Sequence, residues 1–208
     1  MSAWRRALVG GFLAAAGIVG AGGIESAAAP DAACDDDPAC AETVESAREV
    51  AKTLASRLQQ ALQSALGSGD LSGAIAACNQ MAPAYTQRVS TERGWRVTRV
   101  SLKPRNPLLG APDAWEQEVL RQFDRAAASG EDPATLERIE LVEEPQGKRL
   151  RYMKALPVQA PCVTCHGPTE TLASDVAEAL RAQYPHDRAV GYALGELRGA
   201  LSVKVPID

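Results

Sequence analysis

The sequence Cys162-Val163-Thr164-Cys165-His166 constrains this chain more than any other feature. Two thiols three positions apart on a turn can reach two vinyl groups on one edge of a porphyrin, and the histidine that follows can bind the iron. A zinc site would need four ligands, and the chain has no second C-x-x-C and no histidine pair. A thioredoxin-like dithiol is expected in a βαβ unit, whereas these cysteines precede only a short predicted helix. The motif predicts one covalently attached haem c, with Cys162 and Cys165 as attachment sites and His166 as the proximal iron ligand.

The composition agrees with a core that a cofactor completes. Among 208 residues there are two Phe, four Tyr and three Trp, so smaller apolar side chains must supply most of the packing. The formal net charge is −4, and acidic and basic residues are interspersed along the chain. A nucleic-acid-binding protein usually carries a basic face, so no nucleic-acid partner is expected.

The N-terminal residues have the pattern of a secretory signal peptide. Arg5 and Arg6 precede an apolar, uncharged stretch over 7–24, and small residues follow at 26–29. Cleavage after residue 28 is expected to place the protein in the periplasm or outside the cell, without a stable membrane anchor. An uncleaved anchor is the alternative, because about 18 apolar residues can just span a bilayer.

Export also changes how the five cysteines are interpreted. Free thiols are uncommon in an oxidising compartment. Cys34 and Cys40 could pair with one another, whereas Cys78 is left without a partner. The expected organisation is a signal peptide over 1–28, an acidic linker over 29–42 and a c-type haem domain over 43–208.

Two helices are predicted at the start of the domain. Asp37 and Pro38 suit a helix N-cap and first helical position, and apolar residues over 50–65 recur at three- and four-residue spacing. A second helix is expected to begin after Asp70 or Ser72. It should bend just after Cys78, because a proline at position 83 cannot donate to the carbonyl group four residues earlier. The two helices form a predicted N-terminal hairpin.

The rest of the chain mixes strands with helices. Alternating apolar and polar residues predict strands over 95–100, 150–156 and 200–205, with Leu141-Val142 facing the second of these across a turn at 145–147. Helices are expected over 113–128 and 172–182. This order indicates an α+β domain around an antiparallel sheet.

Four residues could supply a second axial ligand opposite the proximal histidine. His186 lies in a polar turn, where a histidine is usually solvated, and Met81 and Met153 have spacings more typical of core packing. Cys78 lies on the apolar side of the bent helix. It either packs as a small buried hydrophobe or binds the iron.

Several blocks carry a family resemblance. They are residues 74–79 with Ala82-Pro83, and residues 94–99, 101–107, 112–116, 151–154, 162–167 and 191–200. In this order, from about residue 43 to residue 206, they resemble the single-haem c-type domains with a PAS-like fold that occur in exported bacterial proteins and in membrane signalling proteins. The resemblance implies a PAS-like antiparallel sheet and a haem with His166 and Cys78 as axial ligands. The chain departs from the family pattern at Val100, at 108–110 and at His186.

Basic residues lie beside the loop expected to close over the haem. Arg99, Lys103 and Arg105 either pair with the haem propionates or lie solvated at a strand end. Trp95 and Trp115 are expected in the core, where they could pack on the porphyrin.

The sequence leads to two hypotheses of function. A thiolate ligand stabilises ferric iron, so a His/Cys haem should have a low potential. If the sulfur bond weakens on reduction, a site opens for CO or NO, and the chain is a redox or gas sensor that signals through a separate protein. The alternative is a small periplasmic electron-transfer cytochrome c with a methionine ligand. No enzymatic activity is expected, because a peroxidase-like site needs an open distal side with an acid–base residue.

Overall fold

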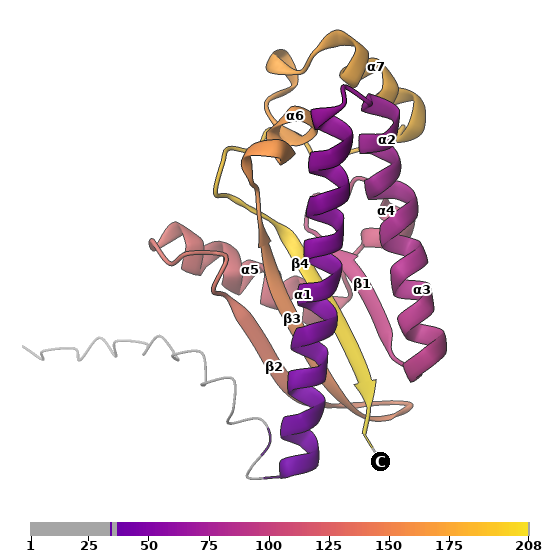
Figure 1. The fold of residues 1–208 in the computed structure, drawn as a ribbon. Coiled ribbons are helices and arrows are strands. Elements are labelled where there is room, and N and C mark those ends of the chain that lie inside the picture. Colours follow the sequence, from indigo (N-terminus) through magenta and orange to yellow (C-terminus); the bar gives the residue numbers. More distant parts are fainter. Residues whose placement is uncertain (1–33, 35–36, 208) are drawn as a thin grey trace, which may run out of the picture.

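A four-stranded antiparallel sheet forms the centre of the molecule in this computed structural model, which describes residue 34 and residues 37–207 (Figure 1). The spatial order is β1-β4-β3-β2, with β1 (Arg96–Val100), β2 (Glu137–Glu144), β3 (Gly147–Pro157) and β4 (Leu197–Pro206). The long strands β3 and β4 lie in the middle, with Tyr152 opposite Val203. The predicted α+β domain around an antiparallel sheet is therefore confirmed. The predicted signal peptide lies outside the described residues.

Helix α1 (Pro38–Gly67) begins where the capping residues predict. The Asp37 side chain accepts a hydrogen bond of 2.9 Å from the Ala39 N–H, and Pro38 needs no such partner. Residues 38–42, assigned to the acidic linker, are thus helical. The assignment was wrong there because the first turn already buries Cys40, which is 5% exposed.

The second helical segment has three parts: α2 (Leu71–Ala76), a π-helical segment η2 (Ala77–Met81) and α3 (Ala82–Arg93). The Asp70 side chain accepts a 2.8 Å hydrogen bond from the Gly73 N–H, so Asp70 rather than Ser72 is the cap. The predicted irregularity at Cys78 is a π-helical turn, a feature that often marks functional sites. Figure 1 shows this segment beside α1, as the predicted hairpin requires.

The sheet buries both of its faces. On one face, α1 and α3 pack against strand residues such as Tyr152, Leu201 and Val203. On the other face, α5 (Ala114–Ala128) packs against Met153 and Ala200. Successive strand residues point to opposite faces, so β1, β3 and β4 contribute to both cores, whereas β2 contributes Ile139 and Leu141 to the α1 side.

Buried charges in this part of the molecule are paired. Arg151, only 4% exposed, lies 2.6 Å from a carboxylate oxygen of Asp113, 3.5 Å from Glu116 and 3.2 Å from Glu144. Burial favours a raised pKa for Asp113, but hydrogen bonds from the Glu116 N–H, Lys204 and Arg151 outweigh it and lower the pKa to about 2. This network joins the start of α5 to the sheet.

Several short helical elements lie toward one end of the molecule. They are α4 (Pro107–Gly110), η3 (Ala160–Cys162), α6 (Val163–His166), η4 (Thr169–Thr171) and α7 (Ser174–Gln183). Figure 1 places α6 and α7 near α2, beyond the ends of the central strands. Within residues 37–207 no helix is both long and apolar enough to cross a membrane.

Candidate haem site

Cys162, Cys165 and His166 lie on one tight turn formed by η3 and α6. A side chain at Gly167 would place its Cβ 2.7 Å from the Val163 carbonyl oxygen, so the turn favours glycine there. Both thiols are free and partly exposed. Cys162 packs beside Val158, Ala189 and Tyr192, and burial raises the pKa of the Cys165 thiol.

The two nitrogens of the His166 imidazole have different partners. Nδ1 lies 2.6 Å from the Ala189 carbonyl oxygen, which can only accept, so Nδ1 carries the proton and Nε2 keeps its lone pair. Burial, followed by the positive charges of Arg198 and Arg105, lowers the pKa of His166 to about 2. This is the neutral tautomer that binds a metal through Nε2.

Positive side chains surround this imidazole. Arg198 Nε lies 3.5 Å from His166 Nε2, and its Nη1 donates to the Ser101 hydroxyl at 3.0 Å. The positive charge of Arg99 also contributes to lowering the pKa of both His166 and Arg198. Burial lowers the pKa of Arg198 to about 10.

Four basic residues lie in this part of the molecule, and they differ in their partners. They are Arg99, Lys103, Arg105 and Arg198. Arg105 Nε pairs with Asp187 at 2.9 Å. Within the described part of the chain, neither Arg99, Lys103 nor Arg198 forms an ion pair with a carboxylate. Lys103 instead lies over the Tyr192 ring, with its Nζ 4.7 Å from the ring centroid. The structure thus brings together the three basic residues singled out in the sequence and adds Arg198.

A close strand contact sets the position of Arg198. The next residue, Gly199, has φ +153°, and a Cβ there would lie 2.3 Å from the Val100 carbonyl oxygen. Only glycine allows β4 to approach the end of β1 so closely. The sequence reasoning missed Arg198, Tyr192 and Asp187 as site residues, although the first two lie in the block over 191–200 that carries the resemblance.

The candidates for a second iron ligand lie in different places. Cys78 is a free, partly buried thiol in η2, and it lies close enough to Cys165 and Tyr184 to contribute to the raised pKa of each. Met153 is fully buried in the core beneath α5. Met81 is 45% exposed and lines a groove between α1 and α3, and His186 is exposed in a turn.

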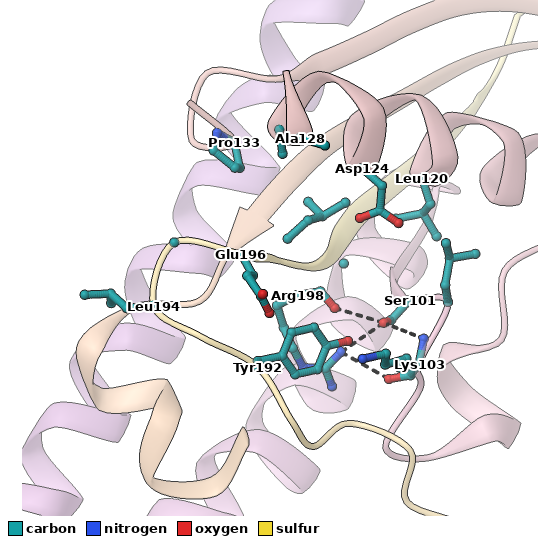
Figure 2. A pocket seen from close by; sticks show the side chains of 15 residues that line it. Ser101, Lys103, Leu120, Asp124, Ala128, Pro133, Tyr192, Leu194, Glu196 and Arg198 are labelled. Atoms are coloured by element: carbon teal, nitrogen blue, oxygen red, sulfur yellow. Dashed lines mark hydrogen bonds between the residues drawn. The ribbon is translucent and has the colours of Figure 1, made fainter. Parts of the chain in front are cut away.

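A cavity of about 610 Å³ lies beside the cations (Figure 2). Its wall includes Lys103, Tyr192 and Arg198, and α5 contributes Leu120 and Asp124. Figure 2 shows the Tyr192 ring next to Arg198, with the hydrogen bonds that join Arg198 to the loop at 101–103. The cavity therefore shares Lys103 and Arg198 with the surroundings of His166, and its lining also includes two acidic residues, Asp124 and Glu196.

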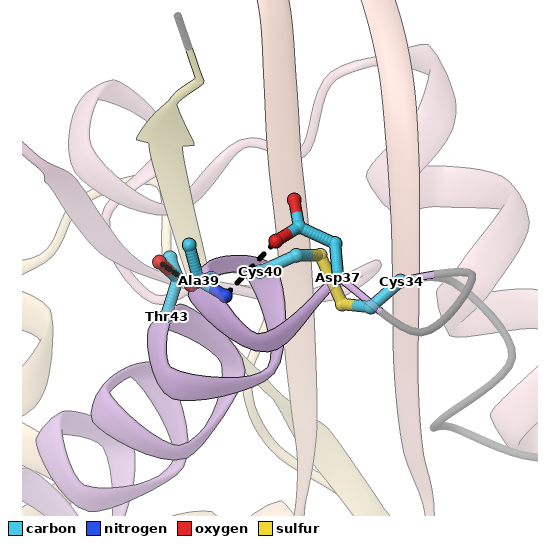
Figure 3. The surroundings of a disulfide bond; sticks show 5 residues. All are labelled: Cys34, Asp37, Ala39, Cys40 and Thr43. Atoms are coloured by element: carbon cyan, nitrogen blue, oxygen red, sulfur yellow. Dashed lines mark hydrogen bonds between the residues drawn. A yellow bond between two sulfur atoms is a disulfide. The ribbon is translucent and has the colours of Figure 1, made fainter.

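Cys34 and Cys40 form a disulfide, the pairing that their spacing allowed (Figure 3). Their Cα atoms lie 5.5 Å apart. The bond ties residue 34 to the first turn of α1, at the opposite end of that helix from its contacts with η2.

Among the described residues, no three His, Cys, Asp or Glu side chains lie together as a group that could hold a metal ion. The two tryptophans outside the predicted signal peptide lie in different cores. Trp95 packs against the α1 core. Trp115 packs against the α5 core under the Arg151 guanidinium.

The residues present fit a covalently held haem. Two free thiols lie on one turn, and the following imidazole presents Nε2 rather than Nδ1. Unpaired cations beside that imidazole suit the carboxylates that a haem carries.

Comparisons with known proteins show the family of the chain and a protein of similar fold. The family model described as Tll0287-like matches residues 27–206, so the chain belongs to that family. The crystal structure of the cyanobacterial haem protein Tll0287 is similar in fold, with a TM-score of 0.59 and 24% sequence identity. The match covers 83% of this chain and 98% of that one. No curated protein matches the chain.

Proposed function

We propose that this chain is an exported c-type haem protein. The Cys162 and Cys165 thiols would hold the haem through covalent bonds to its two vinyl groups, and His166 would bind the iron through Nε2. The observation that carries the proposal is the turn itself, with two free thiols and an imidazole whose Nδ1 is committed to Ala189. The haem character of Tll0287 supports it.

Cys78 is the proposed second axial ligand in a PAS-like domain. Its thiol is free and lies in the π-helical segment, close to Cys165. Met153 is committed to the core beneath α5, and Met81 and His186 are exposed to solvent. These placements favour Cys78 over the other three residues.

The proposed contacts to the propionates come from Arg99, Lys103 and Arg198. None of the three forms an ion pair with a carboxylate in the part of the chain described, and Arg198 is half-buried. A carboxylate placed among them would supply the ion-pair partner that these cations lack there. Arg105, the other basic residue expected there, already pairs with Asp187.

The haem would supply an iron whose potential its axial ligands set. A Cys78 thiolate would favour the ferric state of the iron. If reduction releases the thiolate, the iron would have a vacant position that CO or NO could bind. The chain would then be a redox or gas sensor without catalytic activity, acting on a separate protein partner. The Cys34–Cys40 disulfide supports a periplasmic or secreted location, because such bonds persist in oxidising compartments.

Spectra of the exported, haem-loaded protein test this function. The oxidised, reduced and CO-treated wild type is compared with Cys78→Ala, and Met153→Leu serves as the matched control. We expect Cys78→Ala to change the ferric spectrum, Met153→Leu to leave it unchanged, and the reduced wild type to bind CO. An unchanged Cys78→Ala spectrum, with reversible redox cycling and no CO binding, would favour the electron-transfer alternative.

A further inference from the structure

We propose that Arg105 and Asp187 act together as positioning residues for His166, and that they tune the potential of the haem. This inference rests on the proposed function and adds a means of regulating it. It also gives Arg105 a different role from the propionate contact that the sequence suggested.

The two side chains form a buried ion pair next to the imidazole. Arg105 Nε lies 2.9 Å from Asp187 Oδ2, and each side chain is 11% exposed. Charges this well shielded interact more strongly than those on a surface. The pair therefore fixes the loop after α7 against the loop before α4, and a backbone hydrogen bond from Arg188 to Pro104 joins the same loops at 3.2 Å.

Asp187 also holds the peptide group that orients the imidazole. Its Oδ1 accepts a 2.7 Å hydrogen bond from the Ala189 N–H. The carbonyl group of that same residue accepts the His166 Nδ1–H at 2.6 Å. One carboxylate thus restrains Ala189, which in turn restrains the ring.

Arg105 also contacts the turn that carries His166. Its Nη2 donates to the Cys165 carbonyl group and, at 3.4 Å, to the Ala189 carbonyl group. The same nitrogen lies 3.2 Å from His166 Nδ1. Since both nitrogens carry protons, this contact is not a hydrogen bond, and it places a full positive charge beside the ring.

The backbone completes the clamp around the histidine. The Tyr192 N–H donates to the His166 carbonyl group and the Gly191 N–H to the Gly167 carbonyl group, each at 2.9 Å. The segment 187–192 therefore holds both the main chain and the side chain of His166.

The two members of the pair have opposite electrostatic effects on the imidazole. The hydrogen bond to Ala189 makes the ring a stronger donor, and Asp187 both maintains that bond and neutralises the guanidinium. Asp187→Asn leaves an uncompensated cation beside the ring, which raises the potential. Arg105→Gln leaves an uncompensated carboxylate, which lowers it. If the pair only stabilised the fold, the two substitutions would not shift the potential in opposite directions.

Redox titration of the haem-loaded protein tests the inference. We expect an upward shift in midpoint potential for Asp187→Asn, a downward shift for Arg105→Gln, and a value between these for the double variant. Glu137→Gln is the matched control, because Glu137 pairs with Arg48 at 2.6 Å on the α1 side of the sheet, and it should leave the potential unchanged. The orientation of the axial imidazole, followed by electron paramagnetic resonance, should change in Asp187→Asn.

Two results would overturn the inference while leaving the proposed function in place. One is a shift of the same sign in both single variants, and the other is no shift beyond that of Glu137→Gln. If a single variant does not fold, Asp187→Glu, which keeps the charge, should retain a potential close to the wild-type value, and a shift as large as that expected for a lost charge would contradict the pairing. A wild-type protein without haem would instead overturn the proposed function, and the inference with it.

Discussion

Arg151, which lies on the sheet, and Arg198, which lies beside His166, differ in their charged partners. Beneath α5, Arg151 has three carboxylates within 3.5 Å. Beside His166, Arg198 is half-buried and forms no ion pair with a carboxylate in the part of the chain described. The protein's own carboxylates neutralise Arg151, whereas Arg198 has the charge pattern of a group that an added anion would neutralise.

Loss of Arg151 should give the largest effect on stability. Arg151→Met leaves the Glu144 carboxylate without its cation and leaves Asp113 and Glu116 with Lys204 alone, so we expect a loss of about 3–5 kcal/mol in the free energy of unfolding. Urea denaturation of the mature protein measures it. Arg198→Met should cost clearly less and should instead change the haem potential. Equal losses of stability in the two variants would remove the contrast between the regions.

Removal of the disulfide should have an intermediate effect. Cys34→Ser combined with Cys40→Ser frees a short loop far from His166, and we expect a loss of about 2 kcal/mol because the unfolded chain gains freedom. Thermal or urea unfolding measures the loss. The ferric spectrum should be unchanged, and an altered spectrum would show that the two regions are coupled.

The pH dependence of stability should reveal the Asp113 network. Because the folded-state pKa of Asp113 is lowered to about 2 from an ordinary value of 3.8, its contribution is present above pH 4 and is lost as the pH falls toward 2. Asp113 is 38% exposed, so the contribution should be below about 1 kcal/mol after screening. Urea midpoints of the wild type and Asp113→Asn should converge over this interval. A constant difference would contradict the assignment.

The smallest effect is expected at Lys103. Its ammonium group is exposed and lies over Tyr192, so Lys103→Met should change stability by less than about 1 kcal/mol. Its effect on the midpoint potential should be smaller than that of Arg198→Met, because solvent screens an exposed charge. A larger shift for Lys103→Met than for Arg198→Met would contradict this expectation.

The sequence was informative wherever the signal is local. The helix caps at Asp37 and Asp70 depend on neighbouring backbone groups, and the C-x-x-C-H turn needs only five consecutive residues. The irregularity at Cys78 followed from the proline at position 83, although its π-helical form did not.

The rest of the site depends on contacts between distant parts of the chain. Arg198 reaches His166 because β4 pairs with β1, where Arg99 lies opposite Leu201. Asp187 acts through Ala189, whose contribution is a carbonyl group that every residue possesses. No periodicity or motif marks such a group, so these members of the site required the fold.

The intact mass of the mature protein under denaturing conditions tests the central claim most directly. The protein is purified from cells that attach c-type haem, beside Cys162→Ser/Cys165→Ser. We expect a wild-type mass equal to the mature polypeptide plus one haem, and a bare polypeptide for the double variant. A wild-type mass equal to that of the bare polypeptide would contradict the claim.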